Sequence, residues 1–260
     1  MTDATPTRLA FAEHADAVVA RLTLSDPTRR NALSTAMFDS LEAHLQQVLE
    51  RDATVLAIEA EGPAFCAGFD LRAAVEEEGA LDSFITRLGS LCRTLATLEA
   101  VVVAAVGGPA LAGGAALVSA CDLLLASTEA RIGYPAVRLG ISPAVSLPTL
   151  MPAVGPAMAR RLMLGGELLD GPALARCGWA HATAEDAEGL ASLLDRTVER
   201  LAAAGPESLR ATKSWCREHA GTTPEAFEAA VAATLAVLAD EAGRETCRRR
   251  MAKALDRTRR

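Results

Sequence analysis

The sequence predicts an α/β fold with a layered core of about 160 residues, followed by a helical C-terminal region. Three observations support this prediction. Short apolar runs typical of buried strands alternate with segments of helical periodicity in the first part of the chain. Two glycine-rich loops each follow such a run and precede a helix. From Pro156 onward, strand signals stop and only helix start and stop signals remain.

The first elements are expected to be strands around an amphipathic helix. Apolar runs predict strands at residues 9–11, 18–24 and 55–60, with a turn at Ser25-Asp26-Pro27. Ser34 is a typical N-cap for the intervening helix, whose predicted apolar stripe consists of Phe38, Leu41, Leu45, Val48 and Leu49. A second stripe at helical spacing runs from Leu81 to Leu98.

The middle of the chain is strongly apolar. Residues 101–106 predict a strand buried on both faces of a sheet, and residues 123–126 predict another. Between them, GGPALAGG at 107–114 is expected to form a tight turn and residues 115–120 a short helix. The 22 uncharged residues from Ala100 to Cys121 could span a bilayer by length, but four glycines and a proline favour this soluble interpretation.

Beyond residue 156 the local signals mark the starts and ends of helices. The predicted helix starts are Asp170, Asp186 and Pro224, and the predicted helix stops are Gly165, Gly178 and Gly205.

The composition of the chain argues against several classes of function. A net charge of −7 and only nine aromatic residues argue against nucleic-acid binding. The six cysteines include no CxxC pair, so no metal site is expected. The N-terminus has no apolar signal-peptide core, which predicts a cytoplasmic protein with free thiols. The basic last twenty residues form either a solvated helical tail or a local anion site.

Two loops could carry chemistry. The first, FCAGFD at 65–70, contains Gly68, which permits unusual backbone angles, and Asp70, which can cap the next helix. The second, at 107–114, presents backbone N–H groups at a helix start, where anions bind. It lacks the Lys-Ser/Thr pair of a phosphate-binding P-loop and the spacing of a dinucleotide fingerprint. Oxyanion binding and tight strand–helix packing both remain open from this loop alone.

Four stretches in order resemble the crotonase (enoyl-CoA hydratase/isomerase) superfamily over nearly the whole chain. They are DPTRRNAL at 26–33, FCAGFD at 65–70, VVVAAVGGPALAGGAALVSACDLLLAS at 101–127 and RIGYPAVRLGISP at 131–143. The resemblance implies a crotonase-like spiral of ββα units, with a core at 1–195 and a helical trimerisation region at 196–260. It also implies a homotrimer or a dimer of trimers that binds acyl-CoA thioesters.

The resemblance further assigns site residues. The thioester oxygen would lie between the backbone N–H groups of Phe69 and Gly113, which form an oxyanion hole. The substrate-binding residues implied are Arg30, Ala32, Leu33, Ala67, Gly68, Asp70, Gly114, Ala116 and Ala136. Coenzyme A would be part of the substrate, with no tightly bound cofactor and no metal. Basic residues of the Arg248–Arg250 cluster would meet its phosphates.

The chain departs from this family where hydratases carry acids. The two glutamates that hold a water in a hydratase correspond to Ala116 and Ala136, and the aspartate of dienoyl-type isomerases corresponds to Ala144. A positioned acid or base is worth about 10²–10⁴ in rate, so weak or absent hydratase activity is expected. Three hypotheses follow: an enzyme that uses the oxyanion hole for decarboxylation, thioester cleavage or a proton shift; a non-catalytic acyl-CoA-binding homologue; and a structural subunit.

Other polar residues could replace the acids, although each has a structural interpretation. Ser119 could bond a helix carbonyl, Ser142 and Ser146 lie near a turn, Tyr134 could fill the core and Asp122 could accept a structural hydrogen bond. The acidic run Glu76–Glu78 fits a solvated face. Cys66 has no neighbouring His or Lys in sequence, and the four histidines are scattered, so nucleophilic catalysis has little support.

Overall fold

The computed structural model describes residues 5–14 and 16–258 and confirms the α/β prediction. Its main sheet has the strand order β1-β2-β3-β4-β6-β9 within these residues. The strands are β1 (Thr7–His14), β2 (Ala17–Leu24), β3 (Val55–Ala60), β4 (Val101–Val106), β6 (Leu123–Ser127) and β9 (Ala182–Ala184). Among the described strand pairs of this sheet, only β1–β2 is antiparallel.

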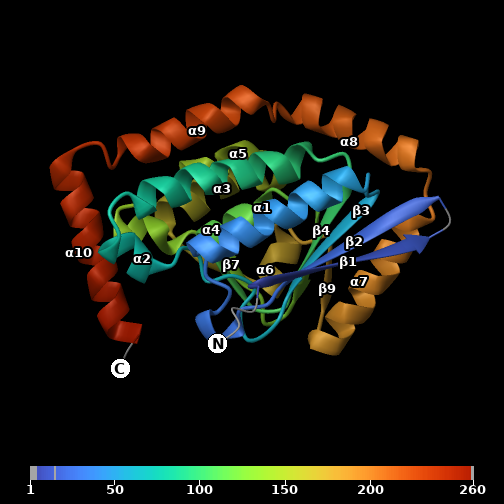
Figure 1. Cartoon of the computed structure of the whole chain (residues 1–260), viewed down its shortest axis with the longest axis horizontal. Helices are drawn as coiled ribbons and strands as arrows, with labels where there is room; N and C mark the ends of the chain where they lie inside the picture. The colour runs from blue at the N-terminus through green and yellow to red at the C-terminus, as the bar shows by residue number, and fades with distance from the viewer. Residues whose placement is uncertain (1–4, 15, 259–260) are drawn as a thin grey trace.

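Helices cover the main sheet on both sides (Figure 1), and the side chains of its strands pack on them in two separate clusters. One face, including Leu22, Leu56 and Val102, joins the large core with α1 (Thr35–Glu50), α3 (Ala80–Thr97) and α4 (Gly113–Ser119). The other face, including Val19 and Val103, packs against α7 (Ala187–Ala202). Because side chains of a strand alternate with a period of two, the central strands are apolar on both faces, as their continuous runs predict.

A smaller sheet lies beside the main one and consists of β5 (Pro109–Leu111), β7 (Arg131–Gly133) and β8 (Leu168–Asp170). The sequence reading missed all three of these strands as well as β9, and the expectation that strands stop at Pro156 is wrong. Each missed strand has three residues. Three residues are too few to show a period of two, so pairing partners rather than local pattern define these strands.

Helix boundaries agree closely with the caps expected. Ser34 caps α1, Asp70 caps α2 (Leu71–Glu76), Asp170 caps α6 (Gly171–Arg176) and Asp186 caps α7. Helix α5 (Leu147–Gly165) ends at its predicted stop. The prediction of a helix stop at Gly205 is wrong, because Gly205 is the N-cap of α8 (Pro206–Ala220). The prediction that Leu49 belongs to the buried apolar stripe of α1 is also wrong, because Leu49 is 49% exposed.

The C-terminal helices α8, α9 (Pro224–Ala236) and α10 (Glu241–Thr258) wrap around the core in an arc (Figure 1). Helix α9 packs along α3, and α10 lies beside α2. Arg248 on α10 donates a hydrogen bond to the Val75 carbonyl (3.3 Å), and Arg244 pairs with Asp82. The predicted boundary at residue 195 falls inside α7, which packs on the main sheet.

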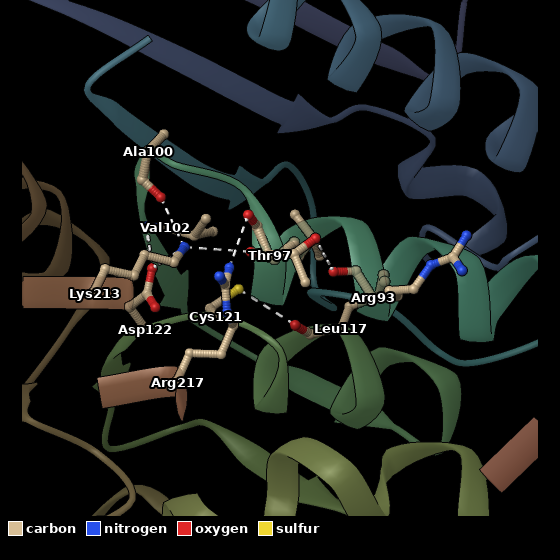
Figure 2. Close-up of polar contacts among 10 residues, drawn as sticks. Arg93, Thr97, Ala100, Val102, Leu117, Cys121, Asp122, Lys213 and Arg217 are labelled. Carbon is tan, nitrogen blue, oxygen red and sulfur yellow. Dashed lines mark hydrogen bonds and ion pairs between the residues drawn. The ribbon is translucent and has the colours of Figure 1, made fainter. Parts of the chain in front are cut away.

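Helix α8 is held to the core by a buried lysine (Figure 2). Lys213 Nζ lies 2.7 Å from Asp122 Oδ2 and donates to the Ala100 carbonyl at 2.8 Å. Asp122 also accepts from the Val102 backbone N–H at 2.7 Å, which confirms its predicted structural role. No helix within the described ranges is long and apolar enough to cross a membrane.

Candidate active site

The first glycine loop is tied to the turn that follows β2. Leu33 donates its N–H to the Gly68 carbonyl (2.8 Å), and Asp70 donates to the Leu33 carbonyl (3.1 Å). Phe69 lies between these two bonds as the bridge partner of Leu33. In a parallel bridge of this form, the N–H of the middle residue points away from the partner chain. None of the backbone hydrogen bonds recorded for the described residues uses the Phe69 N–H.

The second loop is hydrogen-bonded to the first. Cys66 donates to the Pro109 carbonyl (3.1 Å), and its own carbonyl accepts from Leu111 N–H (2.9 Å). Ala112 then adopts φ +50° and ψ −104°, an unusual backbone for a residue with a Cβ. This turn begins α4, so Gly113 presents the first N–H of the helix, which has no intrahelical acceptor.

Close approach of the two loops requires a glycine at position 68. A Cβ on Gly68, whose φ is +89°, would lie 2.9 Å from the Leu111 carbonyl oxygen and 3.7 Å from Gly113 N. A Cβ on Gly113 would lie 2.8 Å from Leu33 Cδ1. The two loops therefore meet within a few ångströms at Gly68, where a side chain would force them apart. A methyl group at position 113 would instead meet the end of the flexible Leu33 side chain.

Both loops open into a cavity of about 530 Å³, which we call the central cavity. Its inner wall is apolar and includes Phe69, Ile85, Leu88 and Val145. Four exposed cations line it as well, and they come from η2 (Pro135–Leu139) and α10: Arg138, Arg250, Lys253 and Arg257. The lining therefore combines an apolar interior with a basic rim.

The residues lining the central cavity include no Asp, Glu, His or Cys from the described part of the chain. The other residues with polar side chains along its wall are Tyr134, Ser142, Ser146 and Thr234, of which Tyr134, Ser146 and Thr234 are buried. Sequence reasoning missed Thr234, which lies on α9 and accepts a hydrogen bond from the Val145 N–H (3.1 Å). It also missed Arg138. Neither residue carries a local signal, because only the tertiary fold brings them to the site.

The predicted site residues divide into two groups. Ala67, Gly68, Phe69, Gly113 and Ala136 line the central cavity. The others support its walls or lie apart from it: Arg30 is exposed, Leu33 is buried against Gly113, Asp70 caps α2, Gly114 packs on Cys66, and Ala32 and Ala116 are absent from the lining.

The alternative candidates have structural partners. Ser119 Oγ donates to the Ala116 carbonyl (2.8 Å), which confirms its predicted role. The Tyr134 hydroxyl donates to the Ala115 carbonyl at 3.3 Å, and its ring is buried. Cys66 is buried, and burial raises the pKa of its thiol to about 12, so the thiolate is scarce at neutral pH. No cluster of three or more potential metal ligands occurs in the described ranges.

Comparisons with known proteins identify the family of this chain. Residues 14–250 match the family model for enoyl-CoA hydratase/isomerase. The chain belongs to the enoyl-CoA hydratase/isomerase family. A Thermus thermophilus protein named "Putative enoyl-CoA hydratase" is 38% identical over 201 residues, which cover 75% of this chain and 79% of that protein. A Mycosarcoma maydis protein named "Enoyl-CoA isomerase/hydratase fer4" is 31% identical over 207 residues, which cover 75% of this chain and 75% of that protein.

Solved structures share the fold of nearly the whole chain. An enoyl-CoA hydratase from Mycobacterium avium superposes with a TM-score of 0.78 at 27% identity, covering 96% of each chain. Pseudomonas aeruginosa AtuE superposes with a TM-score of 0.74 at 30% identity, covering 91% of this chain and 93% of that one. The crotonase-like fold is confirmed, and family-level enzyme function on CoA thioesters goes with it.

Proposed function

We propose that this protein binds an acyl-CoA thioester in the central cavity and polarises its carbonyl with the backbone N–H groups of Phe69 and Gly113, without hydrating double bonds. One observation carries the proposal. Two loops that are hydrogen-bonded to each other bring both residues to one apolar cavity whose described lining has no carboxylate. The basic rim would face the CoA phosphates, and the apolar interior would take the acyl chain.

The chemistry of such a hole is electrostatic. Charge that moves onto the thioester oxygen, as an enolate or a tetrahedral intermediate forms, would be stabilised by two fixed donors in a water-poor site. Backbone donors need no particular side chain, so a phenylalanine at position 69 is compatible with this role. The unusual backbone of Ala112 is consistent with a built site, because strain of this kind clusters at functional positions.

Hydration of an acyl double bond needs more than the oxyanion hole. Water must lose a proton to a base while the α carbon gains one, and the family's two acid positions hold methyl groups in Ala116 and Ala136. Ala136 lines the central cavity, so its methyl stands where a carboxylate could have reached the acyl group. Decarboxylation, thioester cleavage and a proton shift that uses another group remain compatible with the hole.

A second candidate function is a non-catalytic acyl-CoA-binding protein. The same observation favours it, because the described cavity lining offers neither carboxylate nor imidazole nor thiol. Turnover decides between the two functions, while binding is common to both.

The binding experiment compares two ligands that differ only in the carbonyl. Octanoyl-CoA should bind about tenfold more tightly than the thioether S-octyl-CoA by calorimetry, because two N–H donors lose their acceptor in the thioether. Infrared spectra of ¹³C=O-labelled octanoyl-CoA should show a lowered carbonyl stretching frequency on binding. Equal affinities and an unshifted carbonyl would contradict the oxyanion hole.

A matched pair of variants isolates one donor. Gly113→Ala adds a Cβ near Leu33 but keeps the N–H, whereas Gly113→Pro adds bulk and removes the N–H at a first helical position, where proline is tolerated. The infrared shift should persist in the alanine variant and diminish in the proline variant. Separately, crotonyl-CoA hydration should stay below about 1 s⁻¹, the lower end of ordinary turnover numbers.

Two further proposals concern assembly and location. We expect a homotrimer or a dimer of trimers in the cytoplasm. A group of large apolar side chains on the surface, Leu147, Leu164 and Val237, supports self-association, since Leu164 is 78% exposed. Light scattering of the purified protein would show a monomer if this expectation is wrong.

A further inference from the structure

Helix α10 is tied to the two helices that follow Phe69 in the chain. Arg248 Nε donates a hydrogen bond to the Val75 carbonyl on α2 at 3.3 Å. Arg244 Nη1 lies 3.0 Å from Asp82 Oδ2 in the first turn of α3. Figure 1 shows α10 alongside α2, at one end of the C-terminal arc. The two arginines therefore join α10 to both sides of the short connection between α2 and α3.

Phe69 is connected to both of these helices. Asp70, the next residue, caps α2 by accepting hydrogen bonds from the N–H groups of Arg72 and Ala73. On α3, the ring of Phe84 packs against the ring of Phe69, with centroids 5.7 Å apart. A displacement of α2 or α3 therefore reaches the backbone of Phe69, whose N–H group the proposed function assigns to the thioester carbonyl.

The core alone holds α2 weakly. Of its six residues only Ala74 is buried. Residues 76–79 are all exposed, and a Cβ placed on Gly79, whose φ is +75°, would have no atom within 4 Å. A short segment with few buried apolar contacts has low local stability. Contacts from α10 therefore supply constraints on α2 that the core does not.

A different side of α10 carries the basic rim. Arg250, Lys253 and Arg257 line the central cavity, whereas Arg244 and Arg248 do not. In a helix with 3.6 residues per turn, positions 250, 253 and 257 share one side, and positions 244 and 248 share another. A ligand that binds the rim therefore restrains the same helix that holds α2 and α3.

Helix α10 is also packed against the rest of the protein. Cys247 and Met251 are 0% and 1% exposed. Cys247 lies next to the turn after η2, since a Cβ on Gly140 would be 3.7 Å from its Cα. A packed, rigid element of this kind can carry a restraint from one of its sides to another.

We propose that α10 couples the nucleotide half of an acyl-CoA to the Phe69 N–H, with Arg244 and Arg248 as positioning residues. The inference rests on the proposed function, because it takes the carbonyl to lie at Phe69 and the CoA phosphates to lie at the basic rim. Phosphates bound at the rim restrain α10, and α10 in turn restrains α2 and α3 around the donor. Binding energy from a part of the substrate that does not react is thus used to orient the reacting carbonyl. The substrate class is therefore a thioester of CoA and not of free pantetheine.

Hydrogen exchange of the full-length protein tests the coupling. Amides of residues 71–78 should exchange about fivefold more slowly when CoA or octanoyl-CoA saturates the protein. With saturating octanoyl-pantetheine, which lacks the nucleotide phosphates, they should exchange about as fast as in the free protein. Arg248→Met should remove most of the slowing by CoA. Arg160→Met is the matched control, because it replaces an exposed arginine of α5 outside the cavity lining, and it should retain the slowing.

Infrared spectra of ¹³C=O-labelled ligands supply a readout that a purely structural role would not move. The lowering of the carbonyl frequency on binding should be larger for octanoyl-CoA than for octanoyl-pantetheine. In the Arg248→Met variant, the shift of octanoyl-CoA should fall toward that of octanoyl-pantetheine. Circular dichroism should show an unchanged fold, because Arg248 is exposed.

The outcomes separate this inference from the proposed function. Slowing by CoA that Arg248→Met abolishes, together with a diminished carbonyl shift, supports the inference. A shifted octanoyl-CoA carbonyl with exchange that CoA leaves unchanged, or with slowing that persists in Arg248→Met, overturns the inference and leaves the proposed function intact. Loss of the slowing with an undiminished carbonyl shift would show a purely structural role for Arg248 and also overturns it. Failure to bind octanoyl-CoA, or an unshifted carbonyl, overturns both.

Discussion

Replacing Lys213 with methionine should destabilise the protein by about 2–3 kcal/mol at pH 8. The substitution keeps the apolar stem and removes an ammonium that is almost fully buried. Asp122 then keeps only its bond from Val102 N–H, and the Ala100 carbonyl loses its donor. Breaking a buried ion pair costs about 3–5 kcal/mol, but the Asp122 side chain is 29% exposed, which lowers the expected cost.

The same pair gives a pH dependence with a defined sign. Burial raises the pKa of Asp122, and Lys213 opposes this increase. A carboxyl with a raised pKa in the folded state costs stability as the pH rises through that pKa, because only the ionised form is penalised. Without Lys213 the pKa should rise further. The deficit of the Lys213→Met variant should therefore be smaller at pH 5 than at pH 8.

Urea unfolding followed by circular dichroism measures both effects. Arg217→Met is the matched control, since Arg217 also reaches from α8 to a carbonyl, Thr97 O at 3.2 Å, and should cost no more than about 1 kcal/mol. The double variant Lys213→Met/Asp122→Asn should recover part of the loss, because the unpaired charge is gone. A Lys213→Met variant within about 0.5 kcal/mol of the parent at pH 8 would refute the reasoning.

Two further predictions concern the thiols and the basic rim. N-ethylmaleimide should label the exposed Cys216 in the native protein but not the buried Cys66, whose pKa burial raises to about 12; comparable labelling by mass spectrometry would contradict this. Replacing Arg250, Lys253 and Arg257 together by glutamine should weaken octanoyl-CoA binding about tenfold at low salt and leave octanoyl-pantetheine, which lacks the nucleotide phosphates, nearly unaffected. Equal losses for both ligands by calorimetry would contradict a phosphate-binding rim.

The structural features that could be predicted from the sequence are those whose sequence signal lies within a few residues. Caps such as Ser34 and Asp70 could be read directly, because the capping side chain bonds an N–H two or three residues away. The strands of the smaller sheet could not, because their pairing joins segments such as Pro109–Leu111 and Arg131–Gly133 that lack periodicity of their own. Gly205 was misread because glycine is compatible with either end of a helix, and only the neighbouring Pro206 distinguishes the two.

The candidate site shows the same division. Its glycine loops could be located from sequence, since the close approach of the two loops restricts position 68 to glycine. The cavity lining could not be fully predicted. Ala116 seemed to be a site residue by position along the chain, yet it is buried outside the lining, whereas Thr234 reaches the cavity from α9, more than a hundred residues away in sequence. Tertiary packing of the C-terminal helices determines this part of the site.

The proposed carbonyl site depends on the backbone and not on acidic side chains. The hole proposed at Phe69 and Gly113 depends on backbone bonds between the loops, including those of Leu33 and Cys66, and these bonds do not depend on any acidic side chain. The alanines at positions 116 and 136, where the resemblance implies glutamates in hydratases, would thus leave the proposed carbonyl site undisturbed. Such alanines would change the source of the proton, because the described lining of the central cavity has no carboxylate, imidazole or thiol. The reaction should therefore be determined by the group that supplies the proton and not by the hole.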